Sequence, residues 1–435
     1  MIAIIVLCES SMRKIKNDCT RCMCNLSAAV GYEEEIVKNG AIPFLLSNST
    51  SSVQLLEVVL TALLNLSCVP KRYSQIDMVN DAIIHLSGFS MNPSMESILV
   101  SAINNLTGLK NNQARLVEEG VVRILSRIAK CAPLETQQLV ANSFANLSSC
   151  PRSRGKMTDQ RVVLTMLEMT QSTDNDEEIK RQCANTVSRL AMDVSCREKI
   201  VLQGAIAAIV SMCYAKDGKH NSVESDRVCA AALKTLSLDG DNVEKLIQDS
   251  AIPALIALIN NNDKFVRQDC ARCLCIMFEY EAGIDRMIDQ GAVEALVKLA
   301  DPTDIIISAD CALALCNLLS HKEAERVVER GILEALVRLS KSKCETTRIT
   351  CAAALWELTD LSTTDPKKII PALIQMLRDE GGSKIKGDCA AALYNLAQNM
   401  TNCALMMKEV SQATRRIIRN CFFSRPCAFR QNCAT

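Results

Sequence analysis

An apolar quartet with the spacing i, i+3, i+4 and i+7 occurs ten times along the chain, about every 41 residues. The quartets begin at Cys19, Val59, Leu99, Val140, Cys183, Cys229, Cys270, Cys311, Cys351 and Cys389. This spacing places four apolar side chains on one face of a helix. Because the stripe returns at a fixed period, it predicts repeated helical units that bury their stripes against their neighbours, as in an α-solenoid.

A second signature lies between successive quartets. It is a glycine followed by small or branched apolar residues, at Gly40, Gly120, Gly204, Gly291 and Gly331. A glycine there ends a short helix, and Pro43, Pro253 and Pro371 are expected in the first turn of the next helix, which tolerates a missing N–H. Each repeat is therefore predicted to contain one short helix and two longer ones.

The residue before the last member of each quartet defines what we call the ladder position. Six ladder positions carry Asn, mostly within Asn-Leu-Ser or a close variant, at Asn25, Asn65, Asn105, Asn146, Asn317 and Asn395, and the others carry Arg189, Thr235, Ile276 and Glu357. With this helix end, the Gly-Ala-Ile-Pro start at residue 40 and the period, residues 1–410 resemble the armadillo-repeat family. The resemblance implies an all-α fold, a right-handed superhelical solenoid of about ten three-helix repeats.

The two ends of the chain depart from the repeat. Residues 1–19 align without a gap to residues 252–270, so the first repeat is expected to begin at its second helix, as in a fragment or a misassigned start. Residues 411–435 form a basic tail with arginines at 415, 416, 419, 425 and 430. This tail is interpreted either as an amphipathic extension toward an anionic surface or as a final helix that covers the tenth repeat through Ile417, Ile418 and Phe422.

Two stretches lengthen the period, residues 171–178 and 216–226, and each is either a surface insertion or a binding loop. Composition adds few constraints. Equal numbers of basic and acidic residues, 49 each, give no general reason to bind nucleic acid or an anionic membrane. The 23 cysteines are odd in number and seven of them begin a quartet, which indicates core packing in a reducing compartment such as the cytoplasm.

Catalytic chemistry is not apparent in the sequence. The three histidines are scattered, and no P-loop, dinucleotide or HExxH motif occurs. The Cys-x-x-Cys-x-Cys runs at Cys19 and Cys270 fall on quartet positions, so core packing is favoured over a zinc or redox site. We therefore expect no catalytic, cofactor-binding or metal-binding residues, and no enzyme.

The ladder residues share a helix face turned away from the quartets, and stacked repeats align these faces. The family resemblance implies that they line a concave groove, in which Asn amides bond the backbone of an extended partner. The candidate partner-binding residues are Asn25, Asn65, Asn105, Asn146, Arg189, Arg272, Asp310, Asn317, Trp356, Glu357, Tyr394 and Asn395. The alternative for the amides is that each caps its own helix end.

Charge and aromatic side chains distinguish the C-terminal half of this face. Asp269, Asp310, Glu357 and Asp388, set against Arg272, predict an acidic surface that favours basic partner segments, and Asp18 occupies the same register in the first repeat. These aspartates can instead complement the helix dipole. Trp356 and Tyr394 are either an aromatic anchor or packing side chains.

The predicted function is a protein-interaction scaffold that binds extended segments. The alternative is a structural docking component of a cytoskeletal assembly such as the axoneme, which would use the outer faces. Nuclear-import adaptors of the armadillo family pair each ladder Asn with a tryptophan four residues earlier. Trp356 is the only tryptophan here and lies beside the ladder, which argues against a receptor for nuclear-localisation signals. Membrane contact is not expected, and the oligomeric state does not follow from the sequence.

Overall fold

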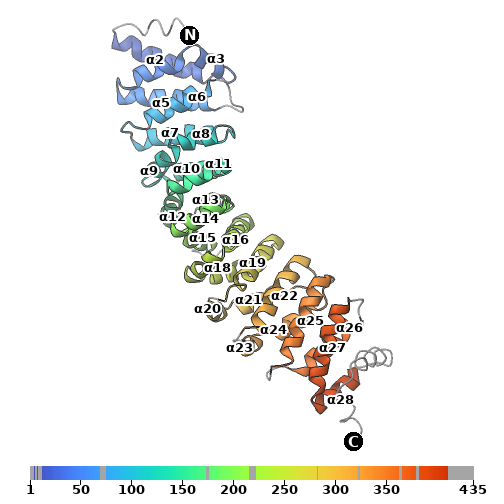
Figure 1. Ribbon diagram of the computed structural model, residues 1–435. Coiled ribbons are helices and arrows are strands. Elements are labelled where there is room, and N and C mark those ends of the chain that lie inside the picture. The colour runs from blue at the N-terminus through green and yellow to red at the C-terminus, as the bar shows by residue number, and fades with distance from the viewer. Residues whose placement is uncertain are drawn as a thin grey trace. The chain divides into compact units, whose positions relative to one another are not determined.

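The computed structural model describes residues 4, 7, 12–68, 75–172, 176–214, 222–281, 283–321, 324–361, 365–378 and 382–409. Within these ranges the chain is helical with short connections and contains no strand (Figure 1). The basic tail at 411–435 and, apart from Ile4 and Leu7, residues 1–11 at the start of the predicted incomplete repeat lie outside the described residues. So do residues 173–175 and 216–221 of the two predicted insertions.

Each repeat contributes a long third helix that carries the quartet. These helices are α2 (Arg13–Ser27), α5 (Val53–Ser67), α7 (Pro93–Thr107), α10 (Leu134–Ser148), α13 (Glu177–Ala191), α16 (Val223–Ser237), α19 (Lys264–Met277), α22 (Ile305–Leu319), α25 (Glu345–Leu358) and α27 (Ser383–Ala397). Several begin at a capping side chain, as where the Asp304 carboxylate accepts the N–H groups of Ile306 and Ile307. The predicted third helix is thus confirmed in all ten repeats.

The second helices are α4 (Ala41–Ser49), α6 (Ile76–Leu86), α9 (Val121–Ala129), α12 (Val162–Ser172), α15 (Ala205–Cys213), α18 (Ala251–Ile259), α21 (Ala292–Leu299), α24 (Ile332–Leu339) and α26 (Pro366–Arg378). The short first helices are α3 (Glu33–Lys38), α8 (Gln113–Glu118), α11 (Pro151–Asp159), α14 (Val194–Leu202), α17 (Val243–Gln248) after the 3-10 turn η1 (Gly240–Asn242), α20 (Ile284–Asp289) and α23 (Ala324–Val328). After the tenth repeat, α28 (Met400–Glu409) packs on α26 and α27.

The chain divides into two compact units, residues 1–232 and 233–435, with the boundary inside α16. In the first unit the third helices pack in sequence, α2 on α5, α5 on α7, α7 on α10 and α10 on α13. The second unit repeats this with α19, α22, α25 and α27. Second helices form a parallel layer in each unit, as with α9, α12 and α15, and Figure 1 shows this stacking within both.

The quartets form the core as predicted in nine repeats, where all four side chains are buried. The first repeat is an exception, because Cys22 is exposed and Leu26 is 37% exposed. Of this repeat the structure describes only α2 and two isolated positions, so most of the surface that would cover the stripe is not described. The prediction that Cys22 is a buried core side chain is therefore wrong in this structure.

A left-handed residue joins the first and second helices of most repeats. Gly40, Gly120, Gly204, Gly291 and Gly331 all have φ near +90°, between 88° and 92°. Arg161 and Ser250 take the same place with φ of 58° and 65°, which the glycine signature did not predict. Pro371 is a further correction: it lies inside the 13-residue helix α26, because the first and second helices of the tenth repeat run together.

Candidate partner-binding surface

Most ladder residues are at least partly exposed in both units. Asn25 is exposed, and Asn65, Asn105, Asn146, Arg189, Asn317, Glu357 and Asn395 are half-buried. Thr235 and Ile276, which depart from the family pattern, are buried. We call the accessible residues the ladder face; its Asn residues fall in two separate stretches, residues 25–146 and 317–395.

Four ladder asparagines donate a hydrogen bond to a hydroxyl of the preceding repeat. The Nδ2–Oγ distances are 3.1 Å for Asn65 to Ser27, 3.0 Å for Asn105 to Ser67, 3.2 Å for Asn146 to Thr107 and 3.1 Å for Asn395 to Thr359. Asn395 also donates to Asp360 Oδ1 at 3.0 Å. Each acceptor lies two residues after the ladder position of its own repeat. The Ser or Thr at the end of the Asn-Leu-Ser motif or its equivalent therefore accepts a hydrogen bond from the ladder Asn of the next repeat.

The same hydroxyls are anchored to their own helices. Ser27, Ser67, Thr107 and Thr359 each donate to the carbonyl oxygen three residues earlier, at 2.6 to 2.8 Å. A hydroxyl has one hydrogen and two lone pairs, so its oxygen remains free to accept the amide N–H. The side-chain amide is therefore held by a two-bond link to the end of the preceding third helix.

For the four linked amides the capping alternative is wrong, because they bond the preceding repeat and not their own helix end. Their contact with a partner backbone stays a prediction. One N–H is committed to the neighbouring repeat, and the Oδ1 atoms of Asn65, Asn105 and Asn146 accept no hydrogen bond within the described residues. None of these oxygens is among the buried polar atoms that lack a partner, so each reaches solvent. An oriented acceptor remains on all three amides for a peptide group, and Asn65 and Asn146 also keep a second N–H, whereas the Asn105 amide nitrogen additionally contacts Cys68 Sγ at 3.1 Å.

Two ladder asparagines lack the link for a visible reason. At Asn317 the acceptor position of the preceding repeat holds Phe278, which has no hydroxyl and is buried. For Asn25, the described residues include no third helix before α2. Neither side chain makes a hydrogen bond within the described residues. The link therefore depends on the Ser or Thr, a signal visible in the sequence that the ladder prediction did not use.

The acidic character predicted for the C-terminal ladder face is weaker in the structure. Asp310 Oδ1 lies 2.8 Å from Arg272 Nη1, and its carboxyl is nearly buried. Asp269 Oδ1 lies 2.5 Å from Lys234 Nζ. Two of the predicted surface acids are thus neutralised by a cation from the preceding third helix, and neither is a helix N-cap, since Asp263 and Asp304 hold those places. Of the predicted acids, this leaves Glu357 and Asp388 without a basic partner among the described residues.

Burial dominates the electrostatics of the Arg272–Asp310 pair. Desolvation raises the pKa of Asp310 above its ordinary value, and the Arg272 hydrogen bond opposes that shift. Asp310 Oδ2 is buried without a hydrogen-bond partner, which fits a carboxyl that one ion pair satisfies only in part. The pair therefore fixes α19 against α22 and offers little charge to a partner.

The two aromatic side chains predicted beside the ladder, Trp356 and Tyr394, are open to solvent. Trp356 is 42% exposed and Tyr394 is 40% exposed, and they occupy equivalent positions on α25 and α27, which pack together. Beside Trp356, the Glu357 carboxylate accepts a hydrogen bond from Ser320 Oγ at 3.1 Å. These two rings add apolar area to a face that in the first unit carries amides.

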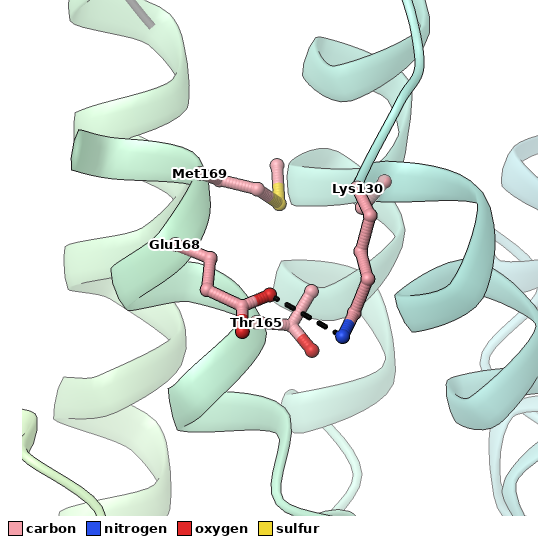
Figure 2. A pocket seen from close by; sticks show the side chains of 5 residues that line it. Lys130, Thr165, Glu168 and Met169 are labelled. Atoms are coloured by element: carbon pink, nitrogen blue, oxygen red, sulfur yellow. Dashed lines mark ion pairs between the residues drawn. The ribbon is translucent and has the colours of Figure 1, made fainter. Parts of the chain in front are cut away.

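A hollow of about 310 Å³ lies away from the ladder face, between α9 and α12 (Figure 2). It is lined by Ala129, Lys130, Thr165, Glu168 and Met169, and Lys130 Nζ lies 3.8 Å from Glu168 Oε2 across it. In Figure 2 the two charged side chains reach toward each other over the opening. Both are well exposed, so the pair is a weak surface contact and the hollow carries no evident chemistry.

Metal sites and membrane-spanning helices are absent from the described part of the chain. It contains no group of three or more His, Cys, Asp and Glu side chains that could hold a metal ion. Among the described helices, none has the length and apolar character needed to span a membrane. Burial moves some cysteines away from reactivity, since it raises the pKa of Cys183 and Cys273 to about 12.

Known proteins resemble the chain in sequence and in fold, although no family model matches it. Vacuolar protein 8 of Candida albicans, an armadillo-repeat protein, is 24% identical over 200 residues, which are 43% of this chain and 32% of that protein. The chain thus spans about a third of this relative. An engineered protein of known crystal structure matches with a TM-score of 0.60 and 22% identity over 91% of this chain and 98% of its own.

A computationally designed armadillo repeat protein for modular peptide recognition matches 54% of this chain and 99% of its own, with a TM-score of 0.45 and 19% identity. The buried quartets, the three-helix units and the match to the engineered protein at a TM-score of 0.60 point to one architecture. The described chain is an all-α solenoid of three-helix units, and its fold is similar to that of armadillo-repeat proteins.

Proposed function

We propose that the chain is a non-enzymatic scaffold that binds extended segments of protein partners along the ladder face. The observation that carries this proposal is the linked amide row of the first unit, Asn65, Asn105 and Asn146. Each amide is oriented before any partner arrives, so binding costs little side-chain entropy. Each also offers an acceptor, and Asn65 and Asn146 offer a donor as well, which together match the groups of an extended peptide backbone.

The two units are proposed to prefer different parts of a partner. In the first unit the amides recognise backbone and leave side-chain identity open. In the second unit Trp356 and Tyr394 provide apolar area beside Asn395, and the remaining acids Glu357 and Asp388 favour basic residues nearby. The preference for basic segments is weaker than the sequence predicts, because Asp269 and Asp310 are already ion-paired.

A paired substitution tests the amide row. Asn65→Ala with Asn105→Ala removes two oriented acceptors, and partner affinity should fall by about 1 kcal/mol or more for each bond lost. The measurement is quantitative recovery, and then affinity, of partners that the tagged wild-type chain retains from its native cells. Stability is measured in parallel, because the links to Ser27 and Ser67 mean that the substitutions also remove two intramolecular bonds.

The matched control is Asn39→Ala. Asn39 follows the short helix α3, away from the ladder face, and its amide bonds only the backbone oxygen of Glu35 at 2.7 Å. Its loss should cost similar helix-end stability and leave partners bound. Equal recovery of every partner by the double variant and the wild type would exclude the ladder face as the binding surface.

A second candidate function is docking within a cytoskeletal assembly, and one observation favours it. Exposed apolar side chains stand at the first residues of the third helices: Phe265 is 58% exposed on α19, and Ile305 is 59% exposed on the adjacent α22. Isolated exposed apolar residues are ordinary, but neighbours on packed helices form a small patch. Fractionation of the native protein between cytosol and cytoskeleton distinguishes the two functions. Phe265→Ser with Ile305→Ser is expected to release a protein docked on the cytoskeleton and to leave partners bound at the ladder face.

A further inference from the structure

Two arginines meet at the C-terminal end of α10 in the first unit. Arg189, at the ladder position of α13, donates from Nη1 to the carbonyl oxygen of Ala145 at 2.5 Å. Arg154, from the short helix α11, donates from Nε to the carbonyl oxygen of Ser148 at 3.1 Å. Both side chains are half-buried, and both guanidinium groups are held by backbone oxygens within one turn of the same helix.

Neither arginine has a carboxylate partner among the described residues. Their charges repel each other, and burial together with Arg154 lowers the pKa of Arg189. Two other cations on third helices are neutralised: Lys234 pairs with Asp269, and Arg272 pairs with Asp310. The end of a helix supplies roughly half a negative charge, which is less than two guanidinium groups carry. This part of the ladder face is therefore left with unbalanced positive charge.

The arginines also retain most of their hydrogen-bonding capacity. A guanidinium group carries five N–H donors, and each of these two uses one nitrogen for a backbone oxygen. The planar arrangement of the remaining donors matches the paired oxygens of a carboxylate or phosphate. Because the bonds to α10 fix both groups before binding, a bound oxyanion would need little further ordering.

We propose that Arg154 and Arg189 form a binding site for an oxyanion carried by a partner segment, either an Asp or Glu carboxylate or a phosphorylated serine. The site rests on the proposed function in one respect, since it supposes that the anion belongs to a protein segment lying along the ladder face. It would set the register of that segment, because the amides of Asn105 and Asn146 read backbone and cannot distinguish one residue from the next.

The structure provides a substitution that removes one charge and keeps the local fold. In four other repeats a ladder Asn bonds the hydroxyl two residues after the preceding ladder position. For residue 189 the equivalent hydroxyl is that of Ser148, whose Oγ donates to Ala145 O at 2.8 Å. Arg189→Asn should therefore form the same link as Asn146 forms with Thr107. Arg154→Gln removes the second charge, and the control is Arg152→Gln, an exposed residue of the same helix without a hydrogen bond in the described structure.

The probes are inorganic phosphate and three short Gly/Ser peptides, with Asp-Asp, phosphoserine or Asn-Asn at the centre. Binding to the full chain is measured at low salt by fluorescence anisotropy for the peptides and by arginine side-chain NMR for phosphate. We expect the phosphoserine and Asp-Asp peptides to bind and the Asn-Asn peptide to bind at least tenfold more weakly. Arg189→Asn and Arg154→Gln should each weaken the binding of the anionic peptides by about tenfold. This is the change in affinity expected when one charge-assisted hydrogen bond is lost.

The two anionic peptides distinguish the sources: stronger binding of phosphoserine assigns the site to a phosphorylated partner, and equal binding assigns it to an acidic one. Equal affinity in wild type, Arg189→Asn and Arg152→Gln, with unchanged melting temperatures, would overturn the proposal. So would the absence of phosphate and peptide binding to the wild type. Suppose that the arginine variants lose affinity for the anionic peptides while Asn65→Ala plus Asn105→Ala leaves cellular partners bound. The oxyanion site then stands, and the proposed binding of partners along the ladder face fails.

Discussion

At the scale of single residues, the link between a ladder amide and a hydroxyl of the preceding repeat is the most consequential contact. We predict that Ser67→Ala and Asn105→Ala each destabilise the first unit by about 1 kcal/mol, and that the double variant costs less than the sum by about 0.5 to 1 kcal/mol. Urea unfolding of the four variants in the cycle measures this coupling. Additive effects would mean that the 3.0 Å contact contributes nothing.

Asn317 provides an internal control for that prediction. Its acceptor position is Phe278 and it makes no side-chain hydrogen bond within the described structure. We expect Asn317→Ala to change stability by less than about 0.5 kcal/mol, as for an ordinary surface substitution. A loss as large as that of Asn105→Ala would show that the amides stabilise their own helices instead.

Cys344 is the cysteine that the structure singles out for reactivity. Hydrogen bonds from the Thr346 hydroxyl, the first cause, and from the N–H of Thr347 lower the pKa of this thiol to about 7. About half of it is thiolate at pH 7, and the thiolate fraction falls as pH drops below 7. We expect iodoacetamide to label Cys344 ahead of Cys316, whose pKa burial raises to about 11.

The Thr346 hydroxyl explains this reactivity and can be removed. Thr346→Val should return the Cys344 pKa toward its ordinary value of 9 and slow labelling at pH 7, whereas labelling at pH 10 should change little. Mass spectrometry of the labelled peptide follows both rates. A pH profile that is identical in the two proteins would exclude the hydroxyl as the cause.

At the scale of the elements, the turn between the first and second helices requires a left-handed residue. Ser250 occupies it with φ of 65°, a conformation that costs an L-residue about 1 to 2 kcal/mol. Glycine avoids this cost but loses some entropy on folding, so Ser250→Gly should stabilise the second unit by about 0.5 to 1 kcal/mol. A thermal or chemical melt of the variant gives the sign directly.

The reciprocal substitution, Gly120→Ser, introduces the same backbone strain in the first unit. Gly120 has φ of 91°, and a Cβ built there meets no atom within 4 Å, so Gly120→Ser strains only the backbone. It should destabilise the first unit by a similar amount. Stabilisation by Gly120→Ser would contradict the assignment of strain to these turns.

At the scale of the whole molecule, stability should follow the repeats, because each third helix packs mainly on its sequence neighbours in its unit. Phe144 is fully buried in α10, and Phe144→Ala should cost about 3 to 5 kcal/mol. Hydrogen exchange should accelerate first in α7, α10 and α13. Protection in α22 and α25 of the second unit should change much less, and uniform acceleration throughout the chain would indicate a single cooperative unit.

The sequence by itself determined the period, the class of fold and the core. Quartets at helical spacing specify which side chains must be buried, and the structure buries them in nine of ten repeats. Burial of apolar area depends on local spacing, so a one-dimensional pattern is enough to predict it. The same reasoning placed the ladder asparagines on an accessible face.

Only the tertiary structure decided what those accessible side chains bond. The partners are about 35 to 44 residues away, as for Asn65 with Ser27, Arg272 with Asp310 and Arg189 with Ala145 O. Hydrogen bonds and ion pairs depend on distances of a few ångströms between repeats, and no spacing along the chain encodes them. These contacts neutralise two of the predicted acids, Asp269 and Asp310, and orient four of the six ladder amides, because a polar group on a stacked helix faces its neighbouring repeat as well as solvent.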